Sequence, residues 1–327
     1  MKLILVVDGG TTNLRVTAVD AGSHEPLSKA GAEGGVKHTA IDGDNHRLKE
    51  MLRDCIARVL SELSCTNADV VRCIAFGMIT SGMGLYEIPH LIAPAGIREL
   101  HEGMKAANFP EIAPFDIEFI PGVRNFSGNV DIGNCAGMDI MRGEEVESIG
   151  LYTRMKPAGN ALLVLPGSHN KFVKLDAGGH ILGCKTSISG ELLDVITHGT
   201  ILADAVGHSF CSGETYDREY ALGGAAECAA SGLGRAAFAG RILRTLGTLP
   251  QEKVQSWLLG AVLMEDVRAL RDFADAGTAV YVAGKPPLQQ AFYDVLEAEG
   301  SMKPVCVDPA LSAGMGLCGA LSIAEIQ

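Results

Sequence analysis

The 327-residue sequence lacks a long hydrophobic run, a closely spaced cysteine pair and an excess of positive charge. No apolar stretch reaches the roughly 20 residues that a membrane-spanning helix needs. The first apolar run, residues 3–7, is short and ends at the carboxylate of Asp8, unlike a secretory signal peptide. We therefore expect a cytoplasmic protein without a membrane partner.

The cysteines show no pattern of disulfides or of metal ligands. There are nine of them, an odd number, and none is spaced as Cys-x-x-Cys. The histidines and cysteines also lack the spacing of a zinc site. We expect reduced cysteines in the core of a cytosolic enzyme, and no structural metal site.

Positive charge is scarce, with 27 Lys and Arg against 39 Asp and Glu, which gives a formal net charge of −12. This charge disfavours nucleic acid or an anionic membrane as a partner. A small anionic substrate stays compatible with it, provided that Arg and Lys cluster around that substrate. The sequence carries no signal for the oligomeric state, so a homodimer stays open.

The chain is long enough for two domains, and a hydrophobic content of 47% is ample for their cores. Residues 3–7 and 14–19 have strand composition. From Leu48 to Leu63, apolar residues recur at the spacing of one helix face, and residues 70–76 form the next predicted strand. This order of elements predicts an α/β domain.

The first two predicted strands are joined by Asp-Gly-Gly-Thr-Thr-Asn at residues 8–13. Glycines let a backbone come close to a ligand, and successive N–H groups in such a turn can form an anion-binding nest. Asp8 is placed to hold a hydrated Mg²⁺ against phosphates. An ordinary hairpin turn without a ligand is the alternative.

A second hairpin repeats this device. Strand 161–165 leads into Pro-Gly-Ser-His-Asn-Lys at 166–171, and strand 172–175 returns. Lys171 is a mobile cation suited to phosphate oxygens, or else a surface lysine at a hairpin tip. Two such hairpins, each in its own α/β half, indicate two related domains facing each other across a cleft.

Further polar groups follow other predicted strands. The glycine-rich loop 77–84 carries hydroxyls that could contact a polar substrate, or is a plain linker. Residues 189–191, Ser-Gly-Glu, open a helix and suit an anion as well as an ordinary cap. At Gly284 a strand meets a helix, where a base or ribose could lie against bare backbone.

A charged segment lies near the middle of the chain. Asp139 sits where a helix would begin, a position that usually indicates only a cap. Arg124 and Arg142 flank the carboxylates of this segment. A solvated, charged first helical turn is the alternative.

Five segments, taken in order, resemble the motifs of the sugar kinase/heat-shock cognate/actin superfamily and, more narrowly, the 2-dehydro-3-deoxygalactonokinase family. They are Gly-Thr-Thr-Asn-Leu-Arg at 10–15, Gly-Met-Ile-Thr-Ser at 77–81, Met-Arg-Gly-Glu-Glu at 141–145, Pro-Gly-Ser-His-Asn-Lys at 166–171 and Ser-Gly-Glu at 189–191. The third and fourth segments together are specific to this family. Gly9 stands where members commonly have Trp, and the loop before Asp139 is longer than usual.

The resemblance implies an α/β fold of two ribonuclease H-like domains of the actin-like ATPase type, facing each other across a nucleotide cleft. It places residues 1–138 in an N-terminal domain, joined by the C-terminal helix 312–327. Residues 139–311 then form the nucleotide-binding C-terminal domain.

The resemblance also implies a function, the transfer of the ATP γ-phosphate to the 6-hydroxyl of 2-dehydro-3-deoxy-D-galactonate in galactonate catabolism. The alternatives are a kinase for another sugar acid or an amino sugar, and a switch-type ATPase of the same superfamily. The sequence does not reveal which epimer of the sugar acid is preferred.

Roles for single residues follow from the resemblance and from the needs of phosphoryl transfer. Asp8 and Asp139 are the predicted catalytic residues: Asp8 holds Mg²⁺ through water, and Asp139 accepts the hydroxyl proton, with Glu144 and Glu145 in reserve. An Arg clamp made by Arg15, Arg124 or Arg142 should hold the substrate carboxylate. The nucleotide and its phosphates are assigned to Asp8, Gly10, Thr11, Thr12, Asn13, Gly167, Ser168, His169, Asn170, Lys171 and Gly284. The sugar acid is assigned to Arg15, Gly77, Met78, Thr80, Ser81, Arg124, Arg142, Glu144 and Glu191.

Overall fold

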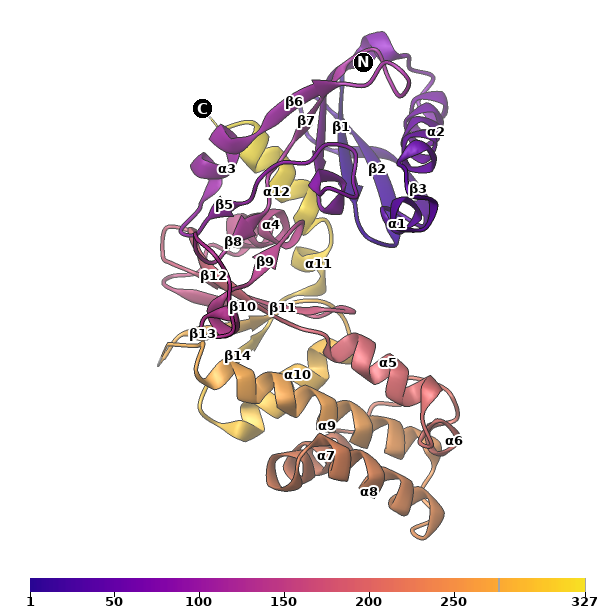
Figure 1. Cartoon of the computed structure of the whole chain (residues 1–327), viewed down its shortest axis with the longest axis vertical. Helices are drawn as coiled ribbons and strands as arrows, with labels where there is room; N and C mark the ends of the chain where they lie inside the picture. The colour runs from indigo at the N-terminus through magenta and orange to yellow at the C-terminus, as the bar shows by residue number, and fades with distance from the viewer. Residues whose placement is uncertain (276, 327) are drawn as a thin grey trace. The chain divides into compact units, whose positions relative to one another are not determined.

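The computed structural model describes residues 1–275 and 277–326 and has an α/β architecture (Figure 1). Contacts divide the chain into two compact units. Unit 1 comprises Met1–Lys156, Gly178–Gly183 and the residues from Gly314 on. Unit 2 comprises Pro157–Ala177 and Cys184–Ala313.

The main sheet of unit 1 has six strands in the order β3-β2-β1-β4-β7-β6. Its strands are β1 (Leu3–Gly9), β2 (Asn13–Asp20), β3 (Pro26–Glu33), β4 (Val70–Phe76), β6 (Lys105–Asn108) and β7 (Asp116–Phe119). Strand β1 lies inside the sheet, antiparallel to β2 and parallel to β4. Its apolar residues are at most 3% exposed, as expected for a strand that is covered on both faces.

A smaller sheet and five helices complete unit 1. The short strands β5 (Leu91–Ile92), β8 (Val123–Arg124) and β9 (Ile140–Met141) pair in the order β5-β8-β9. The helices are α1 (Lys37–Asp42), α2 (His46–Glu62), α3 (Ile97–Gly103), α4 (Glu144–Met155) and α12 (Met315–Ala324), and the 3₁₀ turns are η1 (Asn67–Asp69), η2 (Met78–Thr80) and η3 (Cys135–Gly137). Helix α2 buries its predicted apolar face against the core of the main sheet.

Helices α4 and α12 lie against each other at very short range, with glycines at the contact (Figure 1). A Cβ on Gly150 would overlap the carbonyl oxygen of Met315, and a Cβ on Gly319 would overlap that of Val146. Only glycine therefore allows the two backbones to approach this closely. The small-residue composition of the last helix reflects this packing.

Unit 2 is built on a five-stranded sheet in the order β12-β11-β10-β13-β14. Its strands are β10 (Ala161–Leu165), β11 (Asn170–Leu175), β12 (Ile181–Ser187), β13 (Ala279–Val282) and β14 (Lys303–Cys306), where only residues 184–187 of β12 are grouped with this unit. Its helices are α5 (Ser189–Gly199), α6 (Ala203–Val206), α7 (Arg218–Ser231), α8 (Leu233–Thr245), α9 (Gln251–Arg271), α10 (Leu288–Glu299) and α11 (Pro309–Ser312). Helix α9 contacts α10 as well as α7 and α8, and it contributes a buried face to the core of the unit (Figure 1).

Two local predictions are wrong. Asp139 does not begin a helix, because it precedes strand β9, and α4 starts only at Glu144 after Gly143 turns the chain with φ of +118°. The second hairpin turn is shorter than expected, because β11 already begins at Asn170, and Lys171 pairs with Leu165 across the hairpin.

The domain limits stay a prediction. We expected a boundary at 138/139, whereas the grouping by contacts keeps residues 139–156 with unit 1. It also places the chain from Gly314 on in unit 1, where we expected helix 312–327, whose last residue lies outside the described residues. A grouping of contacts does not by itself define a folding domain.

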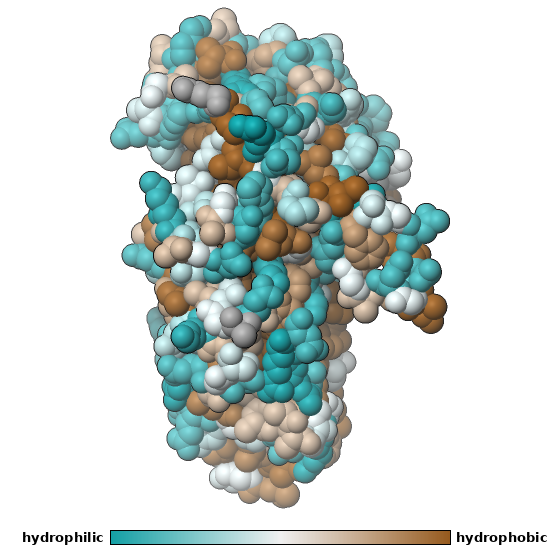
Figure 2. Space-filling view, turned by 90° about the vertical axis from the view of Figure 1, so that its left-hand side faces the viewer, coloured by the Kyte–Doolittle hydropathy of each residue, from teal (hydrophilic) through white to brown (hydrophobic). Residues whose placement is uncertain are grey.

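The surface carries no long apolar segment. In the described part of the chain, no helix combines the length and the apolar character needed to cross a membrane. On the face shown in Figure 2, hydrophilic and hydrophobic residues alternate in small patches. All nine cysteines are free thiols, but Cys135 and Cys306 are exposed, so the expectation that the cysteines lie in the core is wrong for these two.

Candidate active site

The β1–β2 turn of unit 1 has a fixed backbone. The Gly10 N–H donates to the Asn13 carbonyl at 2.9 Å and closes the turn. The Gly34 N–H donates to the Thr12 carbonyl at 2.6 Å from the segment after β3. A Cβ on Gly35 would overlap the Gly10 carbonyl, so glycine is required for this bracing segment to lie against the turn.

Asp8 and Arg15 form an ion pair at the base of this turn. The antiparallel register places them opposite each other, and Arg15 Nη1 lies 3.0 Å from Asp8 Oδ2. Their side chains are 37% and 47% exposed, so both can reach a ligand. Asp8 is thus held in place by a cation and still accessible.

The end of β4 lies against the end of β1. Gly77 has φ of +89°, and a Cβ there would come within 2.9 Å of the Gly9 carbonyl. A Cβ on Gly9 would lie 2.5 Å from Ile79 Cβ, which explains why a large side chain is absent at Gly9 in this chain. The loop that starts at Gly77 therefore lies beside the Asp8 turn.

Glu147, which the sequence analysis did not select, adds a carboxylate to this region. Burial raises its pKa to about 8, the charges of Glu144 and Asp8 raise it further, and Arg15 opposes them. Because Glu144 and Glu147 are three residues apart on α4, they lie on one face of the helix. That spacing was the signal in the sequence that could have found Glu147.

Glu145 has a different environment from its neighbours. It is fully buried, and both of its carboxylate oxygens accept from the Gly143 N–H, at 2.9 and 2.8 Å. Burial, followed by the charge of Glu144, raises the pKa of Glu145 to about 8. These contacts make it a support of the turn at Gly143.

Arg142 is engaged with the loop that follows β4. Its Nη1 donates to the carbonyl and the hydroxyl of Thr80, at 2.6 and 2.7 Å, and its Nη2 donates to the Ile88 carbonyl at 2.6 Å. Burial lowers the pKa of Arg142, although Glu145 and Glu87 oppose this effect. Its observed contacts are thus with protein oxygens of the 77–88 loop.

Arg124 and His90 lie near Arg142 in the same unit. Burial, and then the charges of Arg142 and Arg124, lower the pKa of His90 to about 4, which makes its imidazole neutral at pH 7. Within the described residues, the buried His90 Nε2 and Arg124 Nε have no hydrogen-bond partner. Arg124, Arg142 and the neutral His90 form a basic cluster that suits an anion. The sequence analysis had missed His90.

Asp139 belongs to the small sheet that also carries Arg124. Arg124 pairs with Ile140 across β8 and β9, and the Asn125 N–H donates to the Asp139 carbonyl at 3.0 Å. The Asp139 carboxylate accepts from the Ile140 N–H at 2.7 Å. Asp139 is thus fixed locally, next in sequence to the paired strand residue.

A hollow of about 560 Å³ adjoins the tip of the Asp8 turn. Its lining includes Thr12 and Asn13 of the turn and three basic side chains of the following segment, Lys37, His38 and Arg47. One carboxylate, that of Glu33, faces the same space. The turn thus has an open polar space beside it.

In unit 2, the β10–β11 turn is joined to the start of α5. The Glu191 N–H donates to the Ser168 carbonyl at 3.0 Å, and His169 Nε2 lies 2.8 Å from Glu191 Oε1. A Cβ on Gly190 would overlap the Gly167 carbonyl, so only glycine fits there. The sequence analysis selected both segments, and the structure brings them together.

Lys171 is not an exposed lysine at a hairpin tip. Its residue is 5% exposed in strand β11, and its Nζ donates to Thr186 Oγ1 at 2.5 Å. Gly284, the other expected nucleotide contact, has φ of +97° and donates its N–H to Ser312 Oγ at 3.3 Å.

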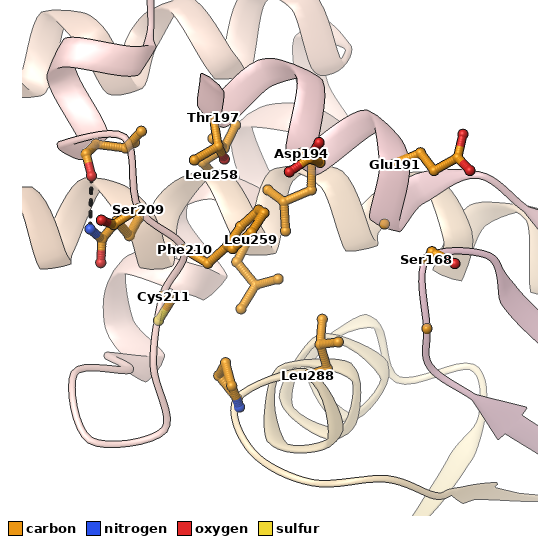
Figure 3. A pocket seen from close by; sticks show the side chains of 16 residues that line it. Ser168, Glu191, Asp194, Thr197, Ser209, Phe210, Cys211, Leu258, Leu259 and Leu288 are labelled. Atoms are coloured by element: carbon orange, nitrogen blue, oxygen red, sulfur yellow. Dashed lines mark hydrogen bonds between the residues drawn. The ribbon is translucent and has the colours of Figure 1, made fainter. Parts of the chain in front are cut away.

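A cavity of about 520 Å³ begins at the β10–β11 turn (Figure 3). Ser168 and Glu191 lie at one end of it, while Phe210 and Leu259 lie side by side in its middle and Leu288 lies on another wall. The rest of the lining comprises Gly167, Gly190, Leu193, Asp194, Thr197, Val206, Ser209, Cys211, Gln255, Leu258 and Pro287. An apolar chamber with a polar, glycine-rich end suits a ligand with a flat apolar part and an anionic tail.

The region around Asp8 offers few carboxylates to a divalent cation. No group of three or more His, Cys, Asp or Glu side chains within residues 1–275 and 277–326 is arranged to hold a metal. The charge of Asp8 nevertheless contributes to the raised pKa of Glu147, an effect that a bound cation would oppose. Mg²⁺ usually binds to only one or two protein carboxylates and keeps several of its water ligands.

Comparisons with known proteins agree in one family. The family model for 2-keto-3-deoxy-galactonokinase matches residues 8–318. The 2-dehydro-3-deoxygalactonokinase of Escherichia coli (strain K12) is 25% identical over 313 residues, which is 95% of each chain.

Solved structures agree on the fold. A Sinorhizobium meliloti protein assigned by name to the 2-dehydro-3-deoxygalactonokinases superposes with a TM-score of 0.77 at 22% identity, over 99% of this chain and 100% of that one. The activator of 2-hydroxyisocaproyl-CoA dehydratase from Clostridium difficile, solved with ADPNP, gives 0.51 at 11% identity, over 98% and 94%. The α/β fold is thus that of the actin-like ATPases, and the chain belongs to the 2-keto-3-deoxy-galactonokinase family.

Proposed function

We propose that this protein transfers the γ-phosphate of ATP to the 6-hydroxyl of 2-dehydro-3-deoxy-D-galactonate. One observation carries the proposal: the central strands of both sheets end in glycine- and hydroxyl-containing turns, and each turn has the chemistry for one half of the reaction. The first has carboxylates beside it, Asp8 and Glu147, and the second opens into the 520 Å³ cavity. Membership of the kinase family supports the same activity.

The nucleotide is assigned to the cavity of unit 2. Its volume of about 520 Å³ exceeds the lower limit of roughly 300 Å³ for small-molecule pockets. Phe210, Leu259 and Leu288 offer apolar surfaces for a base, while the backbone of the Ser168 turn is available to phosphate oxygens. A protein of similar fold, the Clostridium difficile activator, holds ADPNP.

Asp8 and Glu147 are the residues that would hold Mg²⁺, in part through water. Bound Mg²⁺ would neutralise charge on the β- and γ-phosphates, which is the main requirement of phosphoryl transfer. Arg15, 3.0 Å from Asp8, keeps the Asp8 carboxylate oriented toward the turn. The N–H groups of residues 10–13 would stabilise the oxygens of the transferred group.

The base is assigned to Asp139, with Glu144 in reserve. A carboxylate must take the proton of the 6-hydroxyl as the oxygen attacks phosphorus. Glu145 is ruled out of this role in our proposal because it is fully buried and both oxygens are bound by the Gly143 N–H.

The substrate carboxylate is assigned to the basic cluster of Arg124, Arg142 and His90. Arg124 Nε is buried without a partner in the described part of the chain, whereas the Arg142 Nη atoms are bound to carbonyls and a hydroxyl. We therefore expect Arg124 to make the direct contact and Arg142 to hold the 77–88 loop around the sugar. We further propose a cytoplasmic location and leave a homodimer as the state to be tested.

The test is ADP release by the purified protein with Mg-ATP, across a panel of 2-keto-3-deoxy sugar acids and neutral hexoses. Strong stimulation by the galactonate-derived acid and little by its gluconate-derived epimer would support the proposal. Stimulation by a different acid or an amino sugar would keep the mechanism and change the substrate. ADP release that no sugar affects would favour a switch-type ATPase.

A further inference from the structure

A buried carboxylate on α9 lies behind the phosphate end of the cavity. Asp266 is 1% exposed, and its two oxygens have different partners. Oδ1 accepts from Ser189 Oγ at 2.6 Å, and Oδ2 accepts from Asn170 Nδ2 at 2.7 Å. Neither partner comes from α9 itself, so Asp266 joins two segments that are distant in sequence.

These two segments are the ones that form the polar end of the cavity. Asn170 ends the β10–β11 turn, and its Oδ1 accepts from the Gly167 N–H at 3.0 Å. Ser189 is the first residue of α5 and directly precedes Gly190, which lines the cavity together with Gly167. One carboxylate thus bonds to both segments, in addition to the Glu191–Ser168 backbone bond that joins them.

A carboxylate is a costly choice for this position. Burial raises the pKa of Asp266, the charge of Glu265 adds to this effect, and the side chains that oppose it, Ser187, Ser189 and Asn170, are hydroxyl or amide donors. A buried charge without a neighbouring cation lowers the stability of the fold. Apolar side chains of similar volume at such a position often give a more stable protein. We therefore expect that a side chain with two acceptor oxygens serves a role other than stability at position 266.

We propose that Asp266 is a positioning residue for the nucleotide phosphates. It sets the Ser168 turn and the start of α5 at the spacing that presents the N–H groups of Ser168 and Gly190 to one phosphate chain, since the N–H groups of Gly167 and Glu191 donate within the protein. This inference rests on the proposed nucleotide site in unit 2. It predicts that Asp266 affects the binding of phosphates and leaves the binding of the base unchanged, because the base lies against Phe210 and Leu288.

Asp294 provides a matched control. It is 2% exposed on α10 in the same unit, and it too is bound by polar side chains: Tyr216 OH at 2.8 Å and Arg218 Nε at 3.1 Å. None of these three residues lines the cavity. Its amide variant therefore disturbs a buried carboxylate of unit 2 away from the phosphate end.

The experiment compares wild type with Asp266→Asn and Asp294→Asn, using ADP and adenosine as ligands. The asparagine amide presents a donor where an oxygen must accept, so Asp266→Asn loses at least one hydrogen bond. We expect ADP affinity and the KM for ATP to worsen about tenfold or more, with adenosine affinity and the KM for the sugar acid within about twofold. Asp294→Asn should lower Tm and keep the wild-type ratio of ADP to adenosine affinity.

The outcomes separate this inference from the proposed function. An Asp266→Asn protein with the wild-type ratio of affinities, or an Asp294→Asn protein with the same loss, would overturn the inference alone. A wild type that binds no ADP would overturn the nucleotide site and the inference with it. Should Asp266→Asn not fold, Ser189→Ala removes only one of the two bonds, and the same selective loss of ADP affinity is required of it.

Discussion

The two hairpin turns have similar compositions, but the polar residues at the strand ends beside them have opposite environments. In unit 1, the Asp8 and Arg15 side chains are 37% and 47% exposed at the base of the turn. In unit 2, Asn170 and Lys171 are only 1% and 5% exposed and are bound by Asp266 and Thr186. The comparison shows that the same strand-turn-strand motif can expose charged side chains to a substrate in one unit and fix a backbone through buried polar side chains in the other.

This contrast has a kinetic consequence. Changes at the exposed charges of unit 1 should act on kcat or on the sugar acid, since they remove groups that a substrate can touch. Changes in the buried network of unit 2 should act on nucleotide affinity, as argued for Asp266. Five substitutions in unit 1, together with the paired variant Glu144→Gln, test its side of the comparison.

The largest effect is expected from Asp139→Asn. Loss of the proposed base should lower kcat by about 10²–10⁴-fold, with binding of ATP and sugar acid nearly unchanged. Steady-state kinetics with direct binding measurements checks this. Near-normal turnover would move the base to Glu144, and Glu144→Gln is the paired variant.

Asp8→Asn removes one of the two carboxylates proposed to hold Mg²⁺ and leaves the shape of the turn. We expect kcat to fall by about 10²–10³-fold, the size seen when one preorganised electrostatic contact is lost. Raising the Mg²⁺ concentration should restore part of the rate. A variant with wild-type kcat and wild-type Mg²⁺ dependence would contradict the role of Asp8.

Arg124→Ala and Arg142→Ala separate substrate contact from loop support. Arg124→Ala should raise the KM for the sugar acid by about 10- to 100-fold, the worth of one charged hydrogen bond, and spare the KM for ATP. Arg142→Ala should raise the same KM and also lower Tm, because it releases Thr80 and Ile88. If only the KM for ATP suffers in either variant, that arginine belongs with the phosphates.

Glu147→Gln should have the smallest effect of these substitutions, a change in how the free energy of unfolding depends on pH. The pKa of Glu147 is raised to about 8 in the folded protein, so the folded state keeps a proton that the unfolded state loses near pH 4.5. Wild-type stability therefore falls as pH rises from about 4.5 to about 8, by up to about 1.4 kcal/mol per pH unit for this proton.

The variant lacks this proton, so its stability relative to wild type should improve across the same range of pH. Denaturant unfolding at several pH values, without nucleotide or Mg²⁺, measures the difference. Glu214→Gln, at an exposed position, is the control and should follow wild type. A constant difference between Glu147→Gln and wild type would contradict the raised pKa.

The elements of the fold that depend only on neighbouring residues in the sequence could be predicted. The apolar run of β1 and the helical spacing after Leu48 each need only a few neighbouring residues to be recognised. Strand β6, Lys-Ala-Ala-Asn, was not predicted, because an exposed edge strand carries little apolar pattern. Asp139 was misread because the turn at Gly143 delays the helix by five residues, from 139 to 144.

The residues of the candidate site also fall into those that the sequence could predict and those that it could not. The turns beginning at Asp8 and Gly167 could be found because glycines and hydroxyls between strands are a local signature. His90 and Asp266 could not be selected, because their partners are brought to them by tertiary packing. His90 meets Arg142 across 52 residues and Asp266 meets Asn170 across 96, so only the folded chain reveals them.

The most direct test of the central claim is the identity of the product. Purified protein, Mg-ATP and 2-dehydro-3-deoxy-D-galactonate should yield ADP and sugar phosphate in equal amounts, with NMR placing the new phosphate ester on the 6-oxygen. Release of ADP without a phosphorylated sugar, or a phosphate on any other oxygen, would contradict the account.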